Sequence, residues 1–229
     1  MRSRLKTIAI LVATFFLMTA CEESSEVTGE YRILALGDSA LDFNEDEATP
    51  QQLGQVLTER GIENTVQNNA VSGATAACGE DGVGTDANCI PPQIETGNWT
   101  HILLSGGAND ILDSSCSVSA DAMVSEDLSL GHMVEIIDQV TELGHKVILY
   151  GYFRANDNGG EVSSCQALYT LLERFAALGE ARDDILYVDA ADAVTPDNPE
   201  FYGDEIHPSP EGSRVIAELI ADRLVAWDN

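Results

Sequence analysis

Hydrophobic residues along the chain follow two patterns that alternate several times. Short, nearly uninterrupted apolar runs are typical of strands that are buried on both faces of a sheet. Five such runs predict strands at residues 31–36, 65–71, 101–105, 146–152 and 185–188. The second run is the most polar of the five, so it is the weakest of these predictions.

Between these runs, apolar residues recur every three or four positions, which is the period of a helix with one buried face. Helices are predicted at residues 50–60, 133–143 and 165–178, with a last helix from residue 210 onward. Gly61 and Gly144 end the first two, and Ser209 precedes the last as its N-cap, with Pro210 at its first position. Strands that alternate with helices predict an α/β fold, a five-stranded parallel sheet covered on both faces.

The N-terminus has the features of an export signal. Three basic residues among the first six precede an apolar run at residues 7–19, which is too short to span a bilayer as a stable helix. The run leads to Leu17-Met18-Thr19-Ala20-Cys21, which resembles the lipobox of bacterial lipoproteins, where the cysteine thiol is acylated. Met18 stands where an aliphatic residue is usual. The alternative is an ordinary secretory signal that is cut near Ala20.

We therefore expect residues 1–20 to be a lipoprotein signal peptide and Cys21 to carry a lipid that anchors the protein in the bacterial cell envelope. Residues 21–30 are polar and acidic, as in a tether, and residues 31–229 have the length of one domain. All 39 acidic residues and 8 of the 11 basic ones follow Cys21, which gives the mature chain a formal charge of −31. Such a charge disfavours nucleic acid as a partner, and we expect a monomer.

The cysteines that remain after Cys21 are even in number, as expected in an oxidising compartment. They are Cys78, Cys89, Cys116 and Cys165. Three pairings are possible, and proximity along the chain favours the first with the second and the third with the fourth. The sequence alone does not fix this connectivity. It contains no C-x-x-C motif or Cys/His cluster of the kind that binds zinc.

Polar blocks suited to nucleophilic acyl chemistry occur at the ends of three predicted strands. These blocks are Gly37-Asp38-Ser39, Val71-Ser72-Gly73-Ala74 and Gly106-Gly107-Ala108-Asn109-Asp110. Asp204 and His207 lie far downstream, just before the last helix. Because functional residues of parallel sheets collect beyond the carboxyl ends of the strands, we expect the three blocks to lie together there.

Ser39 is the candidate nucleophile, and a serine hydroxyl needs a base to take its proton as it attacks a carbonyl. His207 is the candidate base, since an imidazole can accept a proton near neutral pH. Asp204 would hold one ring nitrogen, direct the other toward Ser39, and stabilise the imidazolium that forms. The inventory therefore predicts acyl transfer.

The four blocks, in this order, resemble those of the GDSL, or SGNH, hydrolases, and the resemblance extends from about residue 32 to residue 222. Ala40 departs from the family pattern, which has leucine there. The resemblance implies a three-layer, flavodoxin-like α/β/α fold and a triad of Ser39, Asp204 and His207. It also implies an oxyanion hole made of the backbone N–H groups of Ser39 and Gly73 and the side-chain amide of Asn109. No metal or cofactor is implied.

The expected function is a serine esterase that hydrolyses carboxylic esters with short acyl or acetyl groups through an acyl-enzyme. One alternative keeps the triad and acts on thioesters or lysophospholipids, and another is a lipid-anchored binding protein without turnover. Residues 75–99 and 111–128 follow the second and third strands and are predicted to form the walls of the substrate site. They are polar and glycine-rich, which argues against a deep tunnel for a long acyl chain.

Some of these residues have simpler explanations. Ser39 alone could be a helix-cap serine, and Asp204 and His207 could merely precede a helix. Asp38 and Asp110 are expected to stabilise their loops rather than to react. The other histidines, which we expect to be structural or exposed, are His101, His132 and His145. Residues 82–86 faintly resemble one calcium-binding repeat, but a single copy between two cysteines predicts a disulfide-closed loop.

Overall fold

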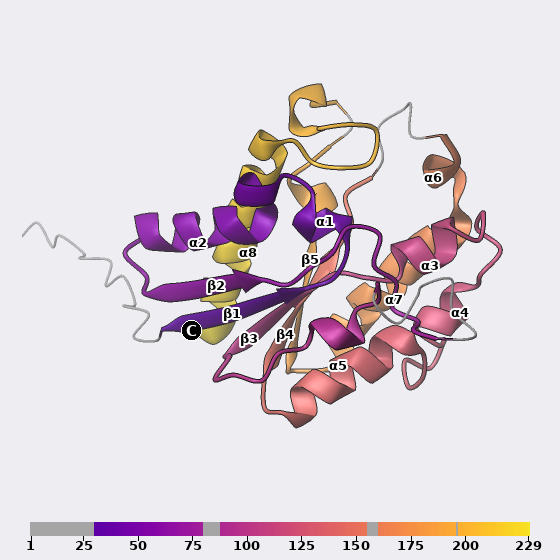
Figure 1. The fold of residues 1–229 in the computed structure, drawn as a ribbon, viewed down its shortest axis with the longest axis horizontal. Coiled ribbons are helices and arrows are strands. Elements are labelled where there is room, and N and C mark those ends of the chain that lie inside the picture. The colour runs from indigo at the N-terminus through magenta and orange to yellow at the C-terminus, as the bar shows by residue number, and fades with distance from the viewer. Residues whose placement is uncertain (1–29, 80–87, 155–159, 196) are drawn as a thin grey trace, which may run out of the picture.

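The computed structural model describes residues 30–79, 88–154, 160–195 and 197–229 (Figure 1). Cys21, the predicted signal peptide, most of the tether and the 82–86 motif lie outside these residues. The described strands form one parallel sheet in the order β2-β1-β3-β4-β5. They are β1 (Tyr31–Leu36), β2 (Asn64–Asn68), β3 (His101–Leu104), β4 (Lys146–Gly151) and β5 (Ile185–Asp189).

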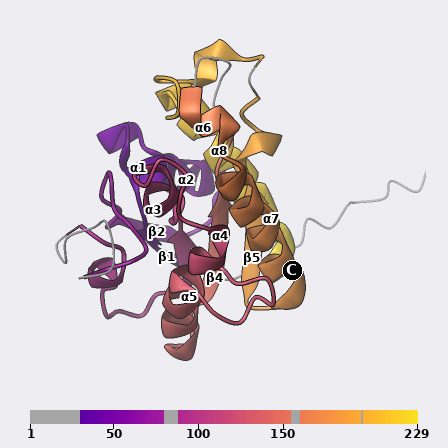
Figure 2. The same ribbon diagram turned by 90° about the vertical axis from the view of Figure 1, so that its right-hand side faces the viewer.

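Four long helices cover the sheet, two on each face (Figures 1 and 2). They are α2 (Thr49–Glu59), α5 (His132–Glu142), α7 (Gln166–Ala181) and α8 (Pro210–Asp228). α2 and α8 pack together on one face, and α5 and α7 pack on the other. The short helices are α1 (Ser39–Asp42), α3 (Ala108–Leu112), α4 (Ala120–Met123) and α6 (Gly160–Ser164). The predicted three-layer α/β/α architecture is confirmed.

Alternation along β1 shows why the sheet needs helices on both sides. Ile33 and Ala35 belong to the apolar cluster shared with α2 and α8, whereas Leu34 and Leu36 belong to the cluster shared with α5 and α7. All four are fully buried. A strand with no solvent-facing side has no reason to carry polar residues, which explains its continuous apolar run.

β2 ends earlier than predicted, at Asn68 rather than at residue 71. The side chain of Asn68 accepts a hydrogen bond from the N–H of Ala70 at 3.1 Å and donates one to the carbonyl of Leu41 at 2.9 Å. Beyond Asn68 the backbone still bonds to the first strand's segment, from the N–H of Asn69 to the carbonyl of Ala35 and from the N–H of Val71 to that of Gly37. β2 lies at one end of the strand order, where only β1 pairs with it, so its polar residues are tolerated.

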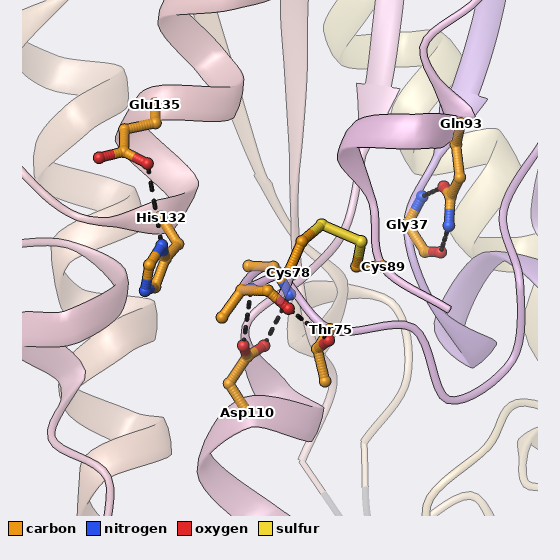
Figure 3. Close-up of a disulfide and its surroundings, with 10 residues drawn as sticks. Gly37, Thr75, Cys78, Cys89, Gln93, Asp110, His132 and Glu135 are labelled. Atoms are coloured by element: carbon orange, nitrogen blue, oxygen red, sulfur yellow. Dashed lines mark hydrogen bonds and ion pairs between the residues drawn. A yellow bond between two sulfur atoms is a disulfide. The ribbon is translucent and has the colours of Figure 1, made fainter. Parts of the chain in front are cut away.

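Two disulfides join loop segments of the described residues. Cys78 pairs with Cys89 (Figure 3), and Cys116 pairs with Cys165, which is the connectivity that sequence proximity favours. The second disulfide connects the segment after α3 to the residue that precedes α7. Among the helices of the described residues, none combines the length and hydrophobicity needed to cross a bilayer.

Candidate active site

The turn after β1 has a conformation that requires glycine. Gly37 has a φ of +146°, and a Cβ atom at this position would lie 2.1 Å from Oγ of Ser105. The buried side-chain amide of Gln93 accepts a hydrogen bond from the N–H of Gly37 at 2.6 Å and donates one to its carbonyl at 2.9 Å (Figure 3). Ser39, two residues later, therefore begins α1 from a firmly held backbone.

Asp38 is the N-cap of α1 and is almost completely buried. Its carboxylate accepts hydrogen bonds from the N–H of Ala40, from Oγ of Ser105 and from the hydroxyl of Tyr152, at 3.1, 2.9 and 2.5 Å. Burial raises the pKa of Asp38 above its usual value, and these hydrogen bonds oppose that rise. Asp38 thus bonds within the loop that carries the candidate nucleophile Ser39, which agrees with the expectation that it stabilises its loop.

Ser39, His207 and Asp204 form one continuous series of hydrogen bonds. Nε2 of His207 lies 2.9 Å from Oγ of Ser39, and Nδ1 of His207 lies 2.7 Å from Oδ2 of Asp204. Because a carboxylate can only accept, Nδ1 carries the proton, and Nε2 of the neutral ring is left to accept one from Ser39. The structure therefore brings together the three residues that the sequence singled out.

The turn that carries Asp204 and His207 keeps the carboxylate charged. Burial alone would raise the pKa of Asp204. Hydrogen bonds from the His207 ring and from the N–H groups of Ile206 and His207 outweigh this effect and hold the pKa below the usual carboxyl value. The Asp204 side chain is 45% exposed and the His207 side chain only 18% exposed. At neutral pH, a negative charge therefore lies against the imidazole.

The other predicted oxyanion donors lie on two loops that are tied together. Gly73 has a φ of +80°, which glycine adopts without strain. The side-chain amide of Asn109, in the first turn of α3, donates one hydrogen bond to the carbonyl of Ala74 at 2.8 Å. An amide nitrogen has two hydrogens, so the second N–H of Asn109 remains available for a substrate oxygen.

Asp110, next to Asn109 in α3, connects the same two loops. Its two carboxylate oxygens accept hydrogen bonds from the N–H groups of Ala76 and Ala77 at 2.8 and 2.9 Å (Figure 3). Asp110 is 3% exposed, and the hydroxyl of Thr75 bonds to the carbonyl of Ala77 beside it. The expectation that Asp110 stabilises a loop agrees with this geometry.

A small cleft of about 60 Å³ lies beside Ser39, Asn109 and His207. Its apolar walls are formed by Leu112, Phe153, Val162, Leu168 and Ile206. Of the two segments predicted to form walls, only the second contributes a large apolar residue to this cleft within the described chain. Three other apolar lining residues, Phe153, Val162 and Leu168, come from the loop after β4 and from α6 and α7, which were not predicted to form walls.

The remaining histidines lie away from this cleft. His101 is buried at the start of β3, where its Nε2 lies 3.2 Å from the carboxylate of Asp228, and burial lowers its pKa to about 4. His132 is half-buried beside Glu135 (Figure 3), and His145 bonds to the carbonyl of Trp99. These positions agree with structural or surface roles.

Three residues around the site were not singled out from the sequence. They are Gln93, which holds Gly37, Tyr152, which bonds to Asp38, and Phe43, whose ring stacks on His207. Gln93 and Tyr152 come from segments far from Ser39 in the sequence, so no local pattern marks them. Phe43 is only four residues from Ser39, and that helical spacing was a usable signal.

With this geometry in place, the sequence itself identifies the family. Residues 35–215 match the GDSL-like lipase/acylhydrolase family. This match covers most of the chain, so the protein belongs to that family and is an ester hydrolase. No curated protein has a significant sequence match to the chain.

Solved structures share the fold at low sequence identity. A carbohydrate acetylesterase family member from Sinorhizobium meliloti is 15% identical, with a TM-score of 0.62 over 86% of this chain and 98% of that one. The psychrotrophic esterase EstA from Pseudoalteromonas sp., in a structure inhibited by monoethylphosphonate, is 17% identical, with a TM-score of 0.58 and coverage of 86% and 97%. TesA is 18% identical, with a TM-score of 0.63 and coverage of 86% and 99%. These likenesses establish the SGNH hydrolase fold.

Proposed function

We propose that the protein is a serine esterase in which Ser39, His207 and Asp204 hydrolyse a carboxylic ester through an acyl-enzyme. The observation that carries this proposal is the series of hydrogen bonds from Asp204 through His207 to Ser39, at 2.7 and 2.9 Å. Both distances lie within the range needed for proton transfer. No rearrangement is needed before the serine can be activated.

In the first half of the reaction, Nε2 of His207 takes the proton of Ser39 as Oγ forms a bond to the ester carbonyl carbon. The negative charge that develops on the carbonyl oxygen is stabilised by the N–H groups of Ser39, Gly73 and the Asn109 side chain. His207 then gives its proton to the departing alcohol oxygen, and the carbon–oxygen bond of the ester breaks. Asp204 stabilises the imidazolium between these two steps.

In the second half, a water molecule takes the place of the alcohol. His207 removes a proton from the water, whose oxygen attacks the acyl-enzyme carbonyl. The tetrahedral intermediate then releases the carboxylic acid, and His207 returns the proton to Ser39. The net reaction consumes one ester and one water and yields one alcohol and one acid.

The cleft favours a short acyl group. Its apolar residues, Leu112, Val162 and Leu168 among them, lie beside Ser39 and Asn109 and suit a small hydrocarbon chain. The similar structures include a carbohydrate acetylesterase family member, which agrees with an acetyl or similarly small group. A thioester or lysophospholipid would use the same triad, but its acyl chain would have to be short to fit this cleft.

We also propose that the enzyme works in the cell envelope, anchored through Cys21. The basic start, the short apolar run and Cys21 support this location, and the acidic residues 22–30 leave a polar spacer before β1. Growth of cells with a fatty-acid analogue should label the wild-type protein and not Cys21→Ala. Label that persists in Cys21→Ala would contradict the anchor.

The function is tested by the hydrolysis of p-nitrophenyl acetate by the wild type, Ser39→Ala and His207→Ala. Each substitution should remove nearly all turnover while thermal unfolding remains close to that of the wild type, because the members of a triad act as a unit. A folded Ser39→Ala protein with wild-type turnover would overturn the proposal. Parallel assays with p-nitrophenyl decanoate, an acyl thioester and a lysophospholipid rank the substrate classes, and we expect the acetyl ester to react fastest.

A further inference from the structure

Phe43 lies flat against the imidazole of His207. The two ring centroids are 4.2 Å apart and the ring planes differ by 9°. This contact covers a face of the imidazole, whereas the hydrogen bonds to Asp204 and Ser39 lie in the plane of the ring. We infer that Phe43 is a positioning residue that aims His207 at Ser39, an inference that rests on the function proposed above.

The turn that carries His207 needs such a support. Residues 203–206 are exposed, and the bonds of Oδ1 of Asp204 to the N–H groups of Ile206 and His207 are local. Local bonds fix the shape of the turn, but its placement over Ser39 depends on contacts with other elements. A ring that could tilt about its side-chain bonds would lose the 2.9 Å approach to Ser39.

Phe43 and its neighbour supply contacts of that kind from the nucleophile's own segment. The ring of Phe43 also lies close to the backbone of Gly203, where an added Cβ atom would be 3.0 Å from it. The side-chain amide of Asn44 donates to the carbonyl of Pro208 at 2.8 Å and to Oγ of Ser213 at 3.0 Å. One residue therefore supports the imidazole ring while the next supports the backbone that follows it.

The place of Phe43 in the sequence couples the base to the nucleophile. Phe43 is the C-cap of α1, and its N–H donates to the carbonyl of Ser39 at 2.9 Å. The flat surface that supports His207 is thus one helical turn from the hydroxyl that His207 must reach. If α1 shifts, both reacting groups shift together, so their distance is maintained.

The flat face of the ring is the property that matters, because stacking restrains the tilt of the imidazole. Leucine fills a similar volume but offers no planar surface. Tyrosine keeps the ring. The structure therefore distinguishes positioning from simple packing by the pair Phe43→Leu and Phe43→Tyr. Phe201→Leu is a matched control, since Phe201 is also half-buried and packs against the α8 side of the sheet.

The test measures kcat and KM for p-nitrophenyl acetate, with kcat divided by the number of sites that a fluorophosphonate probe labels at completion. For Phe43→Leu we expect kcat per labelled site to fall about 10- to 100-fold with KM nearly unchanged, because small misplacements of a catalytic group cost this much. For Phe43→Tyr and Phe201→Leu, kcat per labelled site should stay within about twofold of the wild-type value, a much smaller change than that expected for Phe43→Leu.

Wild-type kcat per labelled site in Phe43→Leu would overturn the inference, since any lost activity would then come from unfolded protein. An equal loss in Phe43→Tyr would also overturn it. Ser39→Ala separates this result from the proposed function. If Ser39→Ala is inactive and Phe43→Leu is normal, only the positioning role fails, whereas an active Ser39→Ala protein contradicts the proposed function itself.

Discussion

The hydroxyl of Tyr152 donates a 2.5 Å hydrogen bond to Oδ2 of Asp38, the residue that directly precedes Ser39. Tyr152 immediately follows β4 and Asp38 follows β1, so this bond connects two strand ends across the sheet. Burial raises the pKa of Asp38, and the Tyr152 bond acts in the opposite direction by favouring the carboxylate. The loop that carries Ser39 is therefore supported by Tyr152, the residue directly after β4.

Removal of this hydroxyl should destabilise the fold in a pH-dependent way. Tyr152→Phe should lower the free energy of unfolding by about 1.5–3 kcal/mol at neutral pH, the scale for a hydrogen bond to a charged group. The folded-state pKa of Asp38 is raised, so its protonated form is favoured in the fold. Stability therefore declines as the pH rises from the unfolded pKa to the folded one. The stability of Tyr152→Phe should decline further over this range, because its Asp38 carboxylate no longer accepts a hydrogen bond from residue 152.

Urea unfolding of both proteins between pH 4 and pH 8 measures this difference. The deficit of Tyr152→Phe should be small at the acidic end and should grow toward neutral pH. A deficit that is the same at every pH would mean that the hydroxyl does not act through the charge of Asp38.

Asp110 should stabilise the loop that carries Gly73. Asp110→Asn keeps the shape but places an amide N–H₂ against the N–H of Ala76 or Ala77, so one buried donor loses its acceptor. We expect a loss of about 1–3 kcal/mol in the free energy of unfolding. Asp113→Asn, at the exposed C-cap of the same helix, is the control and should change stability little. Equal stability of Asp110→Asn and the wild type would contradict this role.

Much of this architecture could be predicted from the sequence, and the exceptions have physical reasons. β1, β3 and β4 are buried on both faces, so their apolar runs stand out, whereas β2 lies at the edge of the sheet and carries polar residues that leave no clear run. The order of strands brings Ser39 and Asn109 together, because both follow adjacent strands β1 and β3.

The walls of the cleft were harder to predict. Phe153 and Leu168 belong to runs whose apolar residues also serve the core, and hydrophobic periodicity does not distinguish a residue that lines a cleft from one that fills a core. The Tyr152 and Gln93 contacts span 114 and 56 residues of sequence. Such contacts depend on tertiary packing, and only the folded chain reveals them.

Asn109 tests the oxyanion hole. Asn109→Asp replaces an N–H donor with a negative charge of the same sign as the oxyanion, so kcat should fall at least ~10²–10³-fold with little change in KM. Asn109→Ala should also be slow, without the added repulsion. Steady-state kinetics with p-nitrophenyl acetate measures both. If both variants lose stability but keep the wild-type kcat once folded, Asn109 only holds its loop in place through the hydrogen bond to the Ala74 carbonyl.

The negative charge of Asp204 should affect kcat more than its hydrogen bonds within the turn do. Asp204→Asn keeps an oxygen that can accept from the N–H groups of Ile206 and His207, but it removes the negative charge beside the imidazole. We expect kcat to fall by up to about 10⁴-fold, the scale for loss of the carboxylate in a serine hydrolase triad. A kcat within twofold of the wild type would show that His207 does not need this carboxylate.

The Asp204 carboxylate should also contribute to stability only above a lower limit of pH. Its folded-state pKa lies below the usual value, so its contribution to stability is complete above the unfolded pKa of 3.8 and is lost as the pH falls through the folded pKa. The difference in unfolding free energy between wild type and Asp204→Asn, measured from pH 7 to pH 3, should therefore not decrease until the pH falls to about 4. A difference that disappears between pH 7 and pH 5 would contradict the low pKa.

Ser39 forms the covalent intermediate in the proposed mechanism, and active-site labelling measures this directly. A fluorophosphonate probe should add to wild-type protein to about one equivalent, with activity lost in proportion, and peptide mass spectrometry should place the adduct on Ser39. Folded Ser39→Ala should take up no label and hydrolyse no p-nitrophenyl acetate. An adduct on another residue, or undiminished hydrolysis by folded Ser39→Ala, would contradict the mechanism.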